Sequence, residues 1–264
     1  MFYLLYLYYA DVAHQYPLLN LVQYQTVRVA LALARGHIEE GQPRPGLDHP
    51  RGQPCGHLPT TAFVNAIQTH DQVGNRPHGE RLASLADPQG VAVAYALLLV
   101  APYIPMVFMG EERGETAPFL FFADFQGDLA RAVREGRAAE FAAIAELGET
   151  VPDPLAFETF ERSRLGWRDD ARAREWLELT RRTLAFRAEK VVPLVKSGRR
   201  GEARVRRLGP ASVAADWPFH AGTLSVALSL GQAQPDLPLP RAPGLVLGRP
   251  GRDPFALSAG VEVP

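Results

Sequence analysis

The most restrictive feature of the sequence is the segment from Pro88 to Ala101, which is apolar on nearly all sides. Asp87 followed by Pro88 is a typical helix start, because Asp accepts hydrogen bonds from the first free amides and Pro fits the first turn. The run QGVAVAYALLLVA continues the pattern until Pro102 ends it. A helix without a polar face belongs inside a protein. The sequence therefore predicts a well-buried helix here.

One short strand is predicted before this helix and another after it, and each is followed by polar residues. The strands are residues 63–68 (FVNAIQ) and 104–109 (IPMVFM), and the polar clusters are residues 70–76 and 110–115. The order strand, polar loop, helix, strand, polar loop is typical of a parallel α/β protein. In such proteins the loops after the carboxyl ends of the strands carry the chemistry. Both clusters are therefore candidate site segments.

The character of the sequence changes near Pro193. Before it, helical spacing predicts helices over 20–35, 128–146 and 171–190, the last with Trp176, Leu177, Thr180 and Leu184 on one stripe. After it, short alternating segments are separated by Gly and Pro, which is typical of a small all-β domain. These segments lie at 203–208, 212–217, 223–229, 244–247 and 255–263.

Charge and cysteine content narrow the range of partners and locations. The formal net charge of −1 provides no field to attract nucleic acid or an anionic membrane. Cys55 is the one cysteine, so no internal disulfide can form and a cytoplasmic location is the simplest. The apolar start MFYLLYLYY is shorter than the roughly 20 residues that cross a bilayer and does not resemble a signal peptide. It is either a buried strand or a sign that the chain begins inside something larger.

Asp71, in the segment FVNAIQTHDQVGNR, is the main candidate for a chemical role. A carboxylate at the carboxyl end of a strand, beside a histidine and an arginine, can stabilise a developing positive charge or orient a hydroxylated ligand. The alternative is a capping aspartate whose neighbour His70 is simply hydrogen-bonded. The residues alone leave both interpretations open.

Glu111 and Glu112 form a second acidic cluster. Glycosidases use two carboxyl groups, about 5–5.5 Å apart for retention and about 6.5–9.5 Å apart for inversion, and Asp71 with one of these glutamates would be such a pair. Alternatively, the glutamates cap the next helix or pair with Arg113 or Arg76.

Other kinds of site are less well supported. The nearby groups His57, His70, Asp71, His78 and Glu80 match no metal-binding motif. There is no phosphate-binding glycine loop and no nucleophile elbow. The sequence therefore predicts neither a metal nor a cofactor. The phenylalanines of APFLFFADF are either a platform for sugar rings or part of the core, and they are Phe119, Phe121, Phe122 and Phe125.

Four blocks of the sequence, in order, resemble the maltooligosyltrehalose trehalohydrolase family of the α-amylase superfamily of glycoside hydrolases. They are FVNAIQTHDQVGNR, PYIPMVFMGEERGETAPFLFFADF, LARAVREGRAAEF and FERSRLGW. The similarity extends from about Tyr8 to the C-terminal β region. It implies an α/β fold, namely a partial (β/α)8 TIM barrel over residues 1–190, followed by a small antiparallel β domain over residues 191–264.

The resemblance also implies roles for individual residues. The THDQ segment matches the superfamily motif at the seventh barrel strand, so Asp71 is expected to be the transition-state stabiliser. His70, Gln72, Asn75 and Arg76 are expected to bind the same sugar. The implied partner is a maltooligosaccharide or maltooligosyltrehalose substrate, cleaved with retention at the α-1,4 bond next to the terminal trehalosyl unit to release trehalose.

The same resemblance implies that two carboxylates are missing. In the superfamily, the nucleophile and the acid/base residue lie on the fourth and fifth strands, upstream of the motif that contains Asp71. No position in this chain matches them, so we expect a C-terminal fragment with little or no activity alone. The alternatives are a non-catalytic maltooligosaccharide-binding module and a truncated polypeptide without a function.

The sequence departs from the family pattern at four positions. Thr69 replaces an asparagine, Arg113 a tryptophan, Phe125 a histidine and Gly166 an aspartate. The loss of the tryptophan and the histidine changes the expected substrate contacts near the eighth strand.

Overall fold

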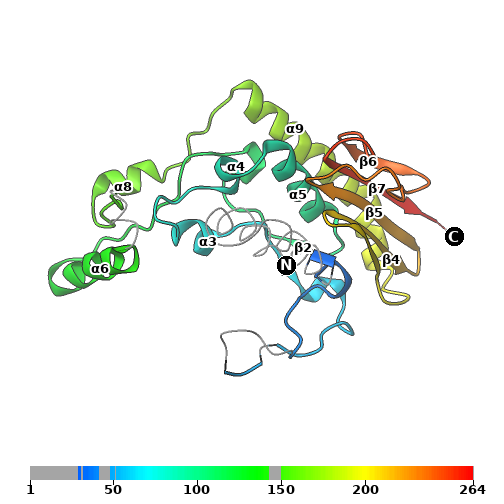
Figure 1. Cartoon of the computed structure of the whole chain (residues 1–264), viewed down its shortest axis with the longest axis horizontal. Coiled ribbons are helices and arrows are strands. Elements are labelled where there is room, and N and C mark those ends of the chain that lie inside the picture. The colour runs from blue at the N-terminus through cyan, green and yellow to red at the C-terminus, as the bar shows by residue number, and fades with distance from the viewer. Residues whose placement is uncertain (1–28, 31, 42–47, 51, 143–149, 264) are drawn as a thin grey trace.

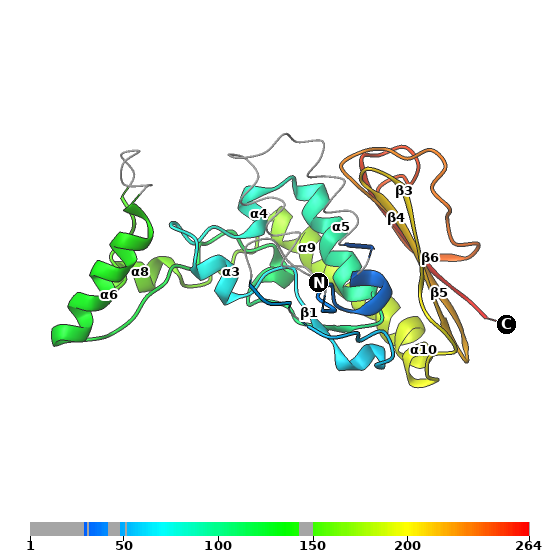
Figure 2. The same ribbon diagram turned by 60° about the horizontal axis from the view of Figure 1, so that its bottom comes forward.

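The computed structural model describes residues 29–30, 32–41, 48–50, 52–142 and 150–263. In two views of the ribbon, a five-stranded sheet lies at one end of the molecule and helices α6 (Gly127–Glu140) and α8 (Phe157–Arg162) lie at the other (Figures 1 and 2). None of the described helices is long and apolar enough to cross a membrane.

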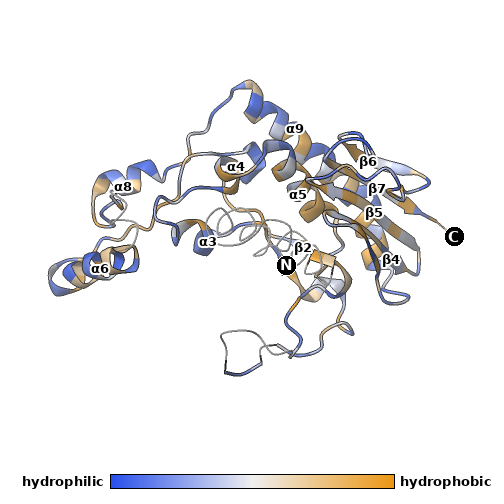
Figure 3. Ribbon diagram, viewed as in Figure 1, coloured by the Kyte–Doolittle hydropathy of each residue, from blue (hydrophilic) through white to orange (hydrophobic). Residues whose placement is uncertain are grey.

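Helix α5 (Pro88–Val100) confirms the predicted buried helix. Asp87 caps it by accepting hydrogen bonds from the amides of Gln89 and Gly90, at 2.8 and 3.2 Å. The residues from Val93 to Val100 are buried and form one apolar rod (Figure 3). This rod packs against helix α9 on one side and against strands β5 and β7 on the other.

Strands β1 (Val64–Asn65) and β2 (Ile104–Pro105) are parallel, as the sequence predicts, but each is only two residues long. Beyond Asn65 the chain leaves the pair, because Ile67 and Gln68 turn into buried positions. Val64 remains 60% exposed and Ile104 remains 41% exposed. The carboxyl ends of both strands lead into the polar clusters, with α5 as the connection between the strands.

The C-terminal sheet confirms the five predicted strands, and its order is β3-β4-β5-β7-β6 with every pair antiparallel. One face packs on the helices through alternate side chains such as Val213, Ala215 and Trp217. On the other face, Leu237 packs on Ala214 and Ala227. The strands are Arg204–Gly209, Ser212–Phe219, Gly222–Leu230, Pro243–Leu247 and Phe255–Glu262.

Helix α9 (Ala171–Phe186) continues through one π-helical turn (Arg187–Val191) into helix α10 (Val192–Lys196). Its predicted stripe is partly wrong. Trp176 and Thr180 are buried, but Leu184 is 43% exposed and the other buried positions are Ala173, Leu179, Thr183 and Phe186. One hydrophobic cluster contains residues of α5, α9 and the sheet together. The domain boundary at residues 190/191 falls within the π-helical turn and stays a prediction.

The remaining predicted helices are found in part. Helix α6 begins within one residue of the predicted start and ends at Glu140, and residues 143–149 lie outside the described part. Of the helix predicted over 20–35, the described residues 29–30 and 32–35 are helical, and Gly36 follows them with a φ of 83°. The apolar start MFYLLYLYY lies outside the described residues. The other short helices are η1 (Thr60–Ala62), α3 (His70–Gly74), α4 (Leu82–Leu85) and η2 (Glu111–Arg113).

Hydrogen bonds to backbone carbonyls join segments that are far apart in the sequence. Tyr103 Oη and Trp217 Nε1 both donate to Leu33 O, at 2.7 and 2.9 Å. The guanidinium of Arg187 donates to three carbonyls at and just beyond the end of α5, those of Leu99, Ala101 and Tyr103, at 2.6–2.8 Å. Arg199 Nη1 donates to Gly56 O and Leu58 O, at 3.0 and 3.2 Å.

Candidate functional site

His70 and Asp71 lie in the first turn of helix α3, which begins five residues after the last residue of β1. Thr69, in extended conformation, is the N-cap of this helix. The side chains of His70 and Asp71 are each 70% exposed, and His70 Nε2 lies 3.1 Å from Asp71 Oδ1. Among the described residues, the Asp71 carboxylate pairs with His70 alone. Both groups therefore face solvent, where a ligand can reach them.

The other three predicted site residues take different positions around α3. Gln72 accepts a hydrogen bond from the hydroxyl of Thr69. Asn75 is exposed at the C-cap. Arg76 is turned toward Glu80, with Nε 3.1 Å from the carboxylate. The structure thus brings all five residues into one short segment, and it leaves only His70, Asp71 and Asn75 predominantly exposed.

A buried hydrogen-bonded pair lies next to this segment. Glu111 is only 4% exposed, and its carboxylate accepts hydrogen bonds from Gln68 Nε2 at 2.9 Å and from the Phe108 amide at 3.0 Å. Burial raises the pKa of Glu111 to about 7, although these hydrogen bonds and Arg81 lower it. The Glu111 carboxylate is therefore bonded to Gln68 and to the Phe108 amide, whereas the alternative in which Glu112 pairs with Arg113 or Arg76 stays a prediction.

Arg81 is fully buried and holds the two ends of the second polar cluster together. Its Nη1 donates to Met109 O at 2.7 Å, and its Nε donates to Ala117 O at 2.6 Å. The guanidinium lies over the ring of Phe108, 4.8 Å from the ring centre. Burial lowers the pKa of Arg81, and the negative charges of Glu115, Glu111 and Glu112 oppose that shift. Its Nη2 is buried without a partner among the described residues, as is Asn65 Nδ2.

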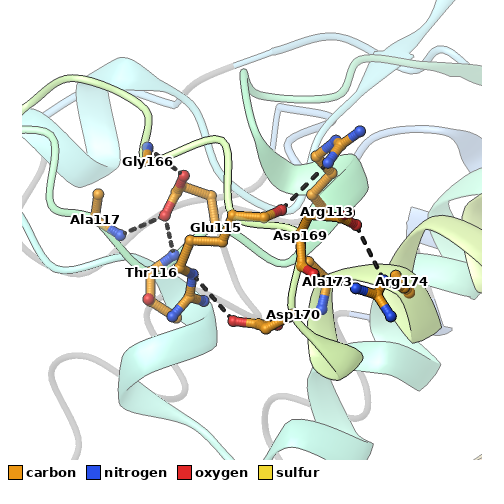
Figure 4. Close-up of polar contacts among 10 residues, drawn as sticks. Arg113, Glu115, Thr116, Ala117, Gly166, Asp169, Asp170, Ala173 and Arg174 are labelled. Atoms are coloured by element: carbon orange, nitrogen blue, oxygen red, sulfur yellow. Dashed lines mark hydrogen bonds and ion pairs between the residues drawn. The ribbon is translucent and has the colours of Figure 1, made fainter.

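Glu115 fastens the second polar cluster to the segment that begins at Gly166 (Figure 4). Its carboxylate accepts hydrogen bonds from the amides of Thr116, Ala117 and Gly166, at 2.8, 2.9 and 2.9 Å. Burial alone would raise the pKa of Glu115, but these amide hydrogen bonds hold it below its ordinary value. Arg113, which replaces the family tryptophan, donates to Arg168 O at 3.2 Å. Two of the four departures from the family pattern, Arg113 and Gly166, therefore lie together at this junction.

The phenylalanines after the second cluster form a line of edge-to-face contacts. Phe119 contacts Phe108 and Phe122, with ring centres 5.4 and 5.8 Å apart, and Phe122 contacts Phe160 at 5.3 Å. Phe121, Phe122 and Phe125 are 42%, 37% and 43% exposed. Phe119 and Phe122 thus pack on other rings, whereas Phe121, Phe122 and Phe125 expose apolar surface, and the role of these phenylalanines as a sugar platform stays a prediction.

Two cavities are formed by other parts of the described chain. One of about 650 Å³ lies between strand β3 and a group of described residues that includes Ala34, Glu40 and His57, and one of about 360 Å³ lies beside α6. Neither is lined by His70 or Asp71. Among the described residues, no group of three or more His, Cys, Asp or Glu side chains is arranged to hold a metal ion.

The sequence analysis missed Gln68, Arg81 and Arg137. Arg137 of α6 is 8% exposed, and its guanidinium donates to carbonyl groups at the C-terminal end of α3. Gln68 could have been found, because it is a polar residue at the end of an apolar predicted strand. No pattern marks the two arginines, because the neighbouring sequence HGERLASL and REGRAAEF resembles ordinary surface sequence.

A solved structure defines the class of protein. A Salmonella typhimurium protein, described as a candidate alpha amylase, superposes on 98% of this chain with a TM-score of 0.86 and 39% sequence identity. This chain covers 45% of that structure. The described fold is therefore that of the C-terminal part of an α-amylase-type glycoside hydrolase.

Curated relatives identify the branch of that class. A Deinococcus radiodurans protein named "Malto-oligosyltrehalose trehalohydrolase" is 36% identical over 89% of this chain. A Saccharolobus solfataricus protein of the same name is 48% identical over 44% of this chain. The chain is a homologue of part of these trehalohydrolases, which confirms the resemblance. It spans 40% and 20% of the two relatives' lengths, and no family model matches it.

Proposed function

We propose that this chain provides the sugar-binding and charge-stabilising part of a retaining glycoside hydrolase site for maltooligosyltrehalose. Asp71 stabilises the positive charge that develops on the sugar, and His70 hydrogen-bonds to the hydroxyls of the same sugar. Gln72, Asn75 and Arg76 serve the same subsite. The complete site cleaves the α-1,4 bond next to the terminal trehalosyl unit and releases trehalose.

The observation that carries the proposal is the solvent-facing His70–Asp71 pair at the carboxyl end of a strand. Loops at that end of parallel strands are the usual place for α/β active sites. A carboxylate that is 70% exposed and that pairs, among the described residues, only with an equally exposed histidine is available to a ligand. A structural carboxylate would be occupied, as that of Glu115 is by three amides.

The chain alone hydrolyses no substrate. A retaining mechanism needs a nucleophile and an acid/base residue about 5–5.5 Å apart. Glu111 and Glu115 are buried, and each accepts two or more hydrogen bonds, so neither offers a free carboxylate to a sugar. Asp71 cannot act as the nucleophile while it also stabilises the developing charge.

The same proposal includes the fold class of the chain and its cellular location. Strands β1 and β2 are the seventh and eighth strands of a partial (β/α)8 barrel over residues 1–190, and residues 191–264 form the terminal β domain. Support comes from the parallel pairing of β1 with β2 and from the position of all five antiparallel strands after residue 203. The chain acts in the cytoplasm, because a sequence with Cys55 as its one cysteine has no need of an oxidising compartment.

Calorimetric titration of the chain with maltooligosyltrehalose and with maltoheptaose, together with an assay for trehalose, tests the proposal. We expect binding without trehalose release, and tighter binding of maltooligosyltrehalose. Asp71→Ala should weaken binding about tenfold or more, which corresponds to the loss of a hydrogen bond to a charged group. Asp128→Ala, at an exposed aspartate of α6, is the matched control and should bind as the wild type does.

Each alternative function gives a different result. Trehalose release that disappears in Asp71→Ala would contradict the inactivity of the chain. Equal affinity for both sugars would favour a general maltooligosaccharide-binding module. Absence of binding would favour a truncated polypeptide with no function of its own.

A further inference from the structure

The position of Asp71 depends on the backbone of helix α3. The Asp71 side chain is exposed and, within the described chain, contacts only its neighbour His70, so no core packing fixes it. Helix α3 is five residues long, whereas isolated helices shorter than about 12 residues are unstable in water. Contacts from outside the helix must therefore hold it in place.

Gln68 holds the N-terminal side of α3. It is 4% exposed, and its Oε1 accepts a hydrogen bond from the Leu82 amide at 3.0 Å. Its Nε2 donates to Glu111 at 2.9 Å. The chain is thus fixed two residues before His70.

Arg137 of helix α6 holds the C-terminal side. Its Nη2 donates to Gly74 O at 2.8 Å and to Arg76 O at 3.1 Å. Gly74 is the last residue of α3, and the carbonyls at the C-terminal end of a helix receive no hydrogen bond from an amide of the same helix. A side chain more than sixty positions away along the sequence therefore supplies a donor to Gly74 O and a second donor to Arg76 O, which also accepts from the Gly79 amide at 3.3 Å.

The guanidinium of Arg137 is held firmly on its other sides. Its Nη1 donates to Glu140 at 2.9 Å, and its Cζ lies 4.4 Å from the ring centre of Phe141 and 5.4 Å from that of Phe121. A buried charge is costly unless its donors are used. Any movement of the α3 end away from Arg137 would leave a buried guanidinium with unused donors, so the contact resists such movement.

We propose that Arg137 is a positioning residue that fixes the C-terminal end of α3 and thereby the orientation of the His70–Asp71 pair. Its effect on sugar affinity rests on the function proposed above, whereas its effect on the order of α3 does not. The two effects are measured separately in the same set of variants.

The test compares Arg137→Ala and Arg137→Lys with the wild-type chain. Hydrogen exchange reports the order of α3 through three amides, since Val73 N donates to Thr69 O, Asn75 N to Asp71 O and Arg76 N to Val73 O. We expect exchange at these amides to rise about tenfold in Arg137→Ala, with strands β4 and β5 unchanged, and maltooligosyltrehalose affinity to fall about tenfold. Arg137→Lys keeps the charge but lacks the planar fork of the guanidinium. It should therefore lose less exchange protection in α3 and less sugar affinity than Arg137→Ala does.

Two variants are matched controls on the same helix. Arg134→Ala removes an exposed arginine that pairs with Asp153 and should change neither readout. Glu140→Gln alters the other partner of Arg137 while both carbonyl bonds remain, and it should have little effect.

The proposal would be overturned if a folded Arg137→Ala variant showed wild-type hydrogen exchange at residues 70–76 together with wild-type affinity. If the alanine variant does not fold, the same result in Arg137→Lys would overturn it. A wild-type chain that binds no sugar would refute the proposed function, and the exchange measurement would still decide whether Arg137 orders α3.

Discussion

The C-terminal sheet and the β1–β2 pair are stabilised in different ways. Each strand of the sheet has at least five residues, and its central strands β4, β5 and β7 are largely buried. Strands β1 and β2 have two residues each, and Val64, Ile104, Met106 and Met109 are 41–60% exposed beside them. Apolar packing therefore stabilises the sheet, whereas the segments around β1 and β2 depend on buried polar groups.

This difference indicates why the candidate site lies beside β1. Buried polar contacts such as those of Gln68, Arg81 and Glu111 fix loops in one geometry, which a binding site needs. They add less stability than the apolar core, because each charged group loses its hydration on burial. The two regions should therefore respond differently to mutation and to pH.

Trp217→Ala should cause the largest loss of stability. The indole is 2% exposed and donates to Leu33 O, so the variant loses a core side chain and leaves a buried carbonyl with one partner fewer. We expect a decrease of about 4 kcal/mol in the free energy of unfolding, measured by urea denaturation. Trp167→Ala, at a tryptophan that is 66% exposed, should change it by less than about 0.5 kcal/mol. Equal losses would contradict the assignment of the main core to the sheet.

Arg81→Met should destabilise the β1–β2 region and spare the sheet. The variant leaves Met109 O and Ala117 O without their donor and removes the positive charge near Glu111 and Glu115. A loss of about 3 kcal/mol is expected. Hydrogen exchange should rise in residues 108–117 and stay unchanged in β5. A uniform increase over both regions would contradict the local role of Arg81.

Glu111→Gln should remove a pH-dependent part of the stability. The pKa of Glu111 is raised to about 7 by burial, so the folded state holds its proton more tightly than the unfolded state. The stability that the protonated Glu111 contributes is fully present below pH 4.5, which is the pKa of the unfolded state, and it is lost as the pH rises through about 7. Between about pH 5 and pH 8 the wild type should therefore lose roughly 2–3 kcal/mol more than the variant, measured by urea denaturation. Parallel pH curves would refute this.

Asp71→Ala should have the smallest effect on stability, below about 0.5 kcal/mol, because the side chain is 70% exposed. The same variant should lose sugar binding, so it separates function from stability in one position. A large decrease in the melting temperature would show that Asp71 has a structural role instead.

The sequence was sufficient for elements that depend on local patterns. Helix α5 was predicted from Asp87, Pro88 and Pro102. The five strands were predicted from short segments of alternating polarity that are separated by Gly and Pro. The stripe of α9 was partly wrong, because it included Leu184, which is exposed, and omitted Thr183, which is buried with its hydroxyl donating within the helix to Leu179 O. Helical spacing alone gives no sign that the threonine at 183 is buried in place of the leucine at 184.

The candidate site could be predicted only in its exposed part. His70 and Asp71 were found because they come just after the strand predicted over residues 63–68. The groups that hold them in place were not, because their partners are backbone carbonyls and amides brought together by the tertiary fold. Arg137 bonds to residues 61 and 63 positions away, and Glu111 bonds to a residue 43 positions away. Spacing along the sequence contains no information of that kind.

Arg81, Arg137, Arg187 and Arg199 each donate to two or more backbone carbonyls, and the sequence contains only two lysines, Lys190 and Lys196. An ammonium group carries its three donors on one nitrogen, whereas at each of these positions two nitrogens of the planar guanidinium reach separate acceptors. Exchange of arginine for lysine, which is conservative at most protein surfaces, is therefore a disruptive change at these four positions. Substitution matrices that treat the two residues as near equivalents will underestimate the effect of such variants in this chain.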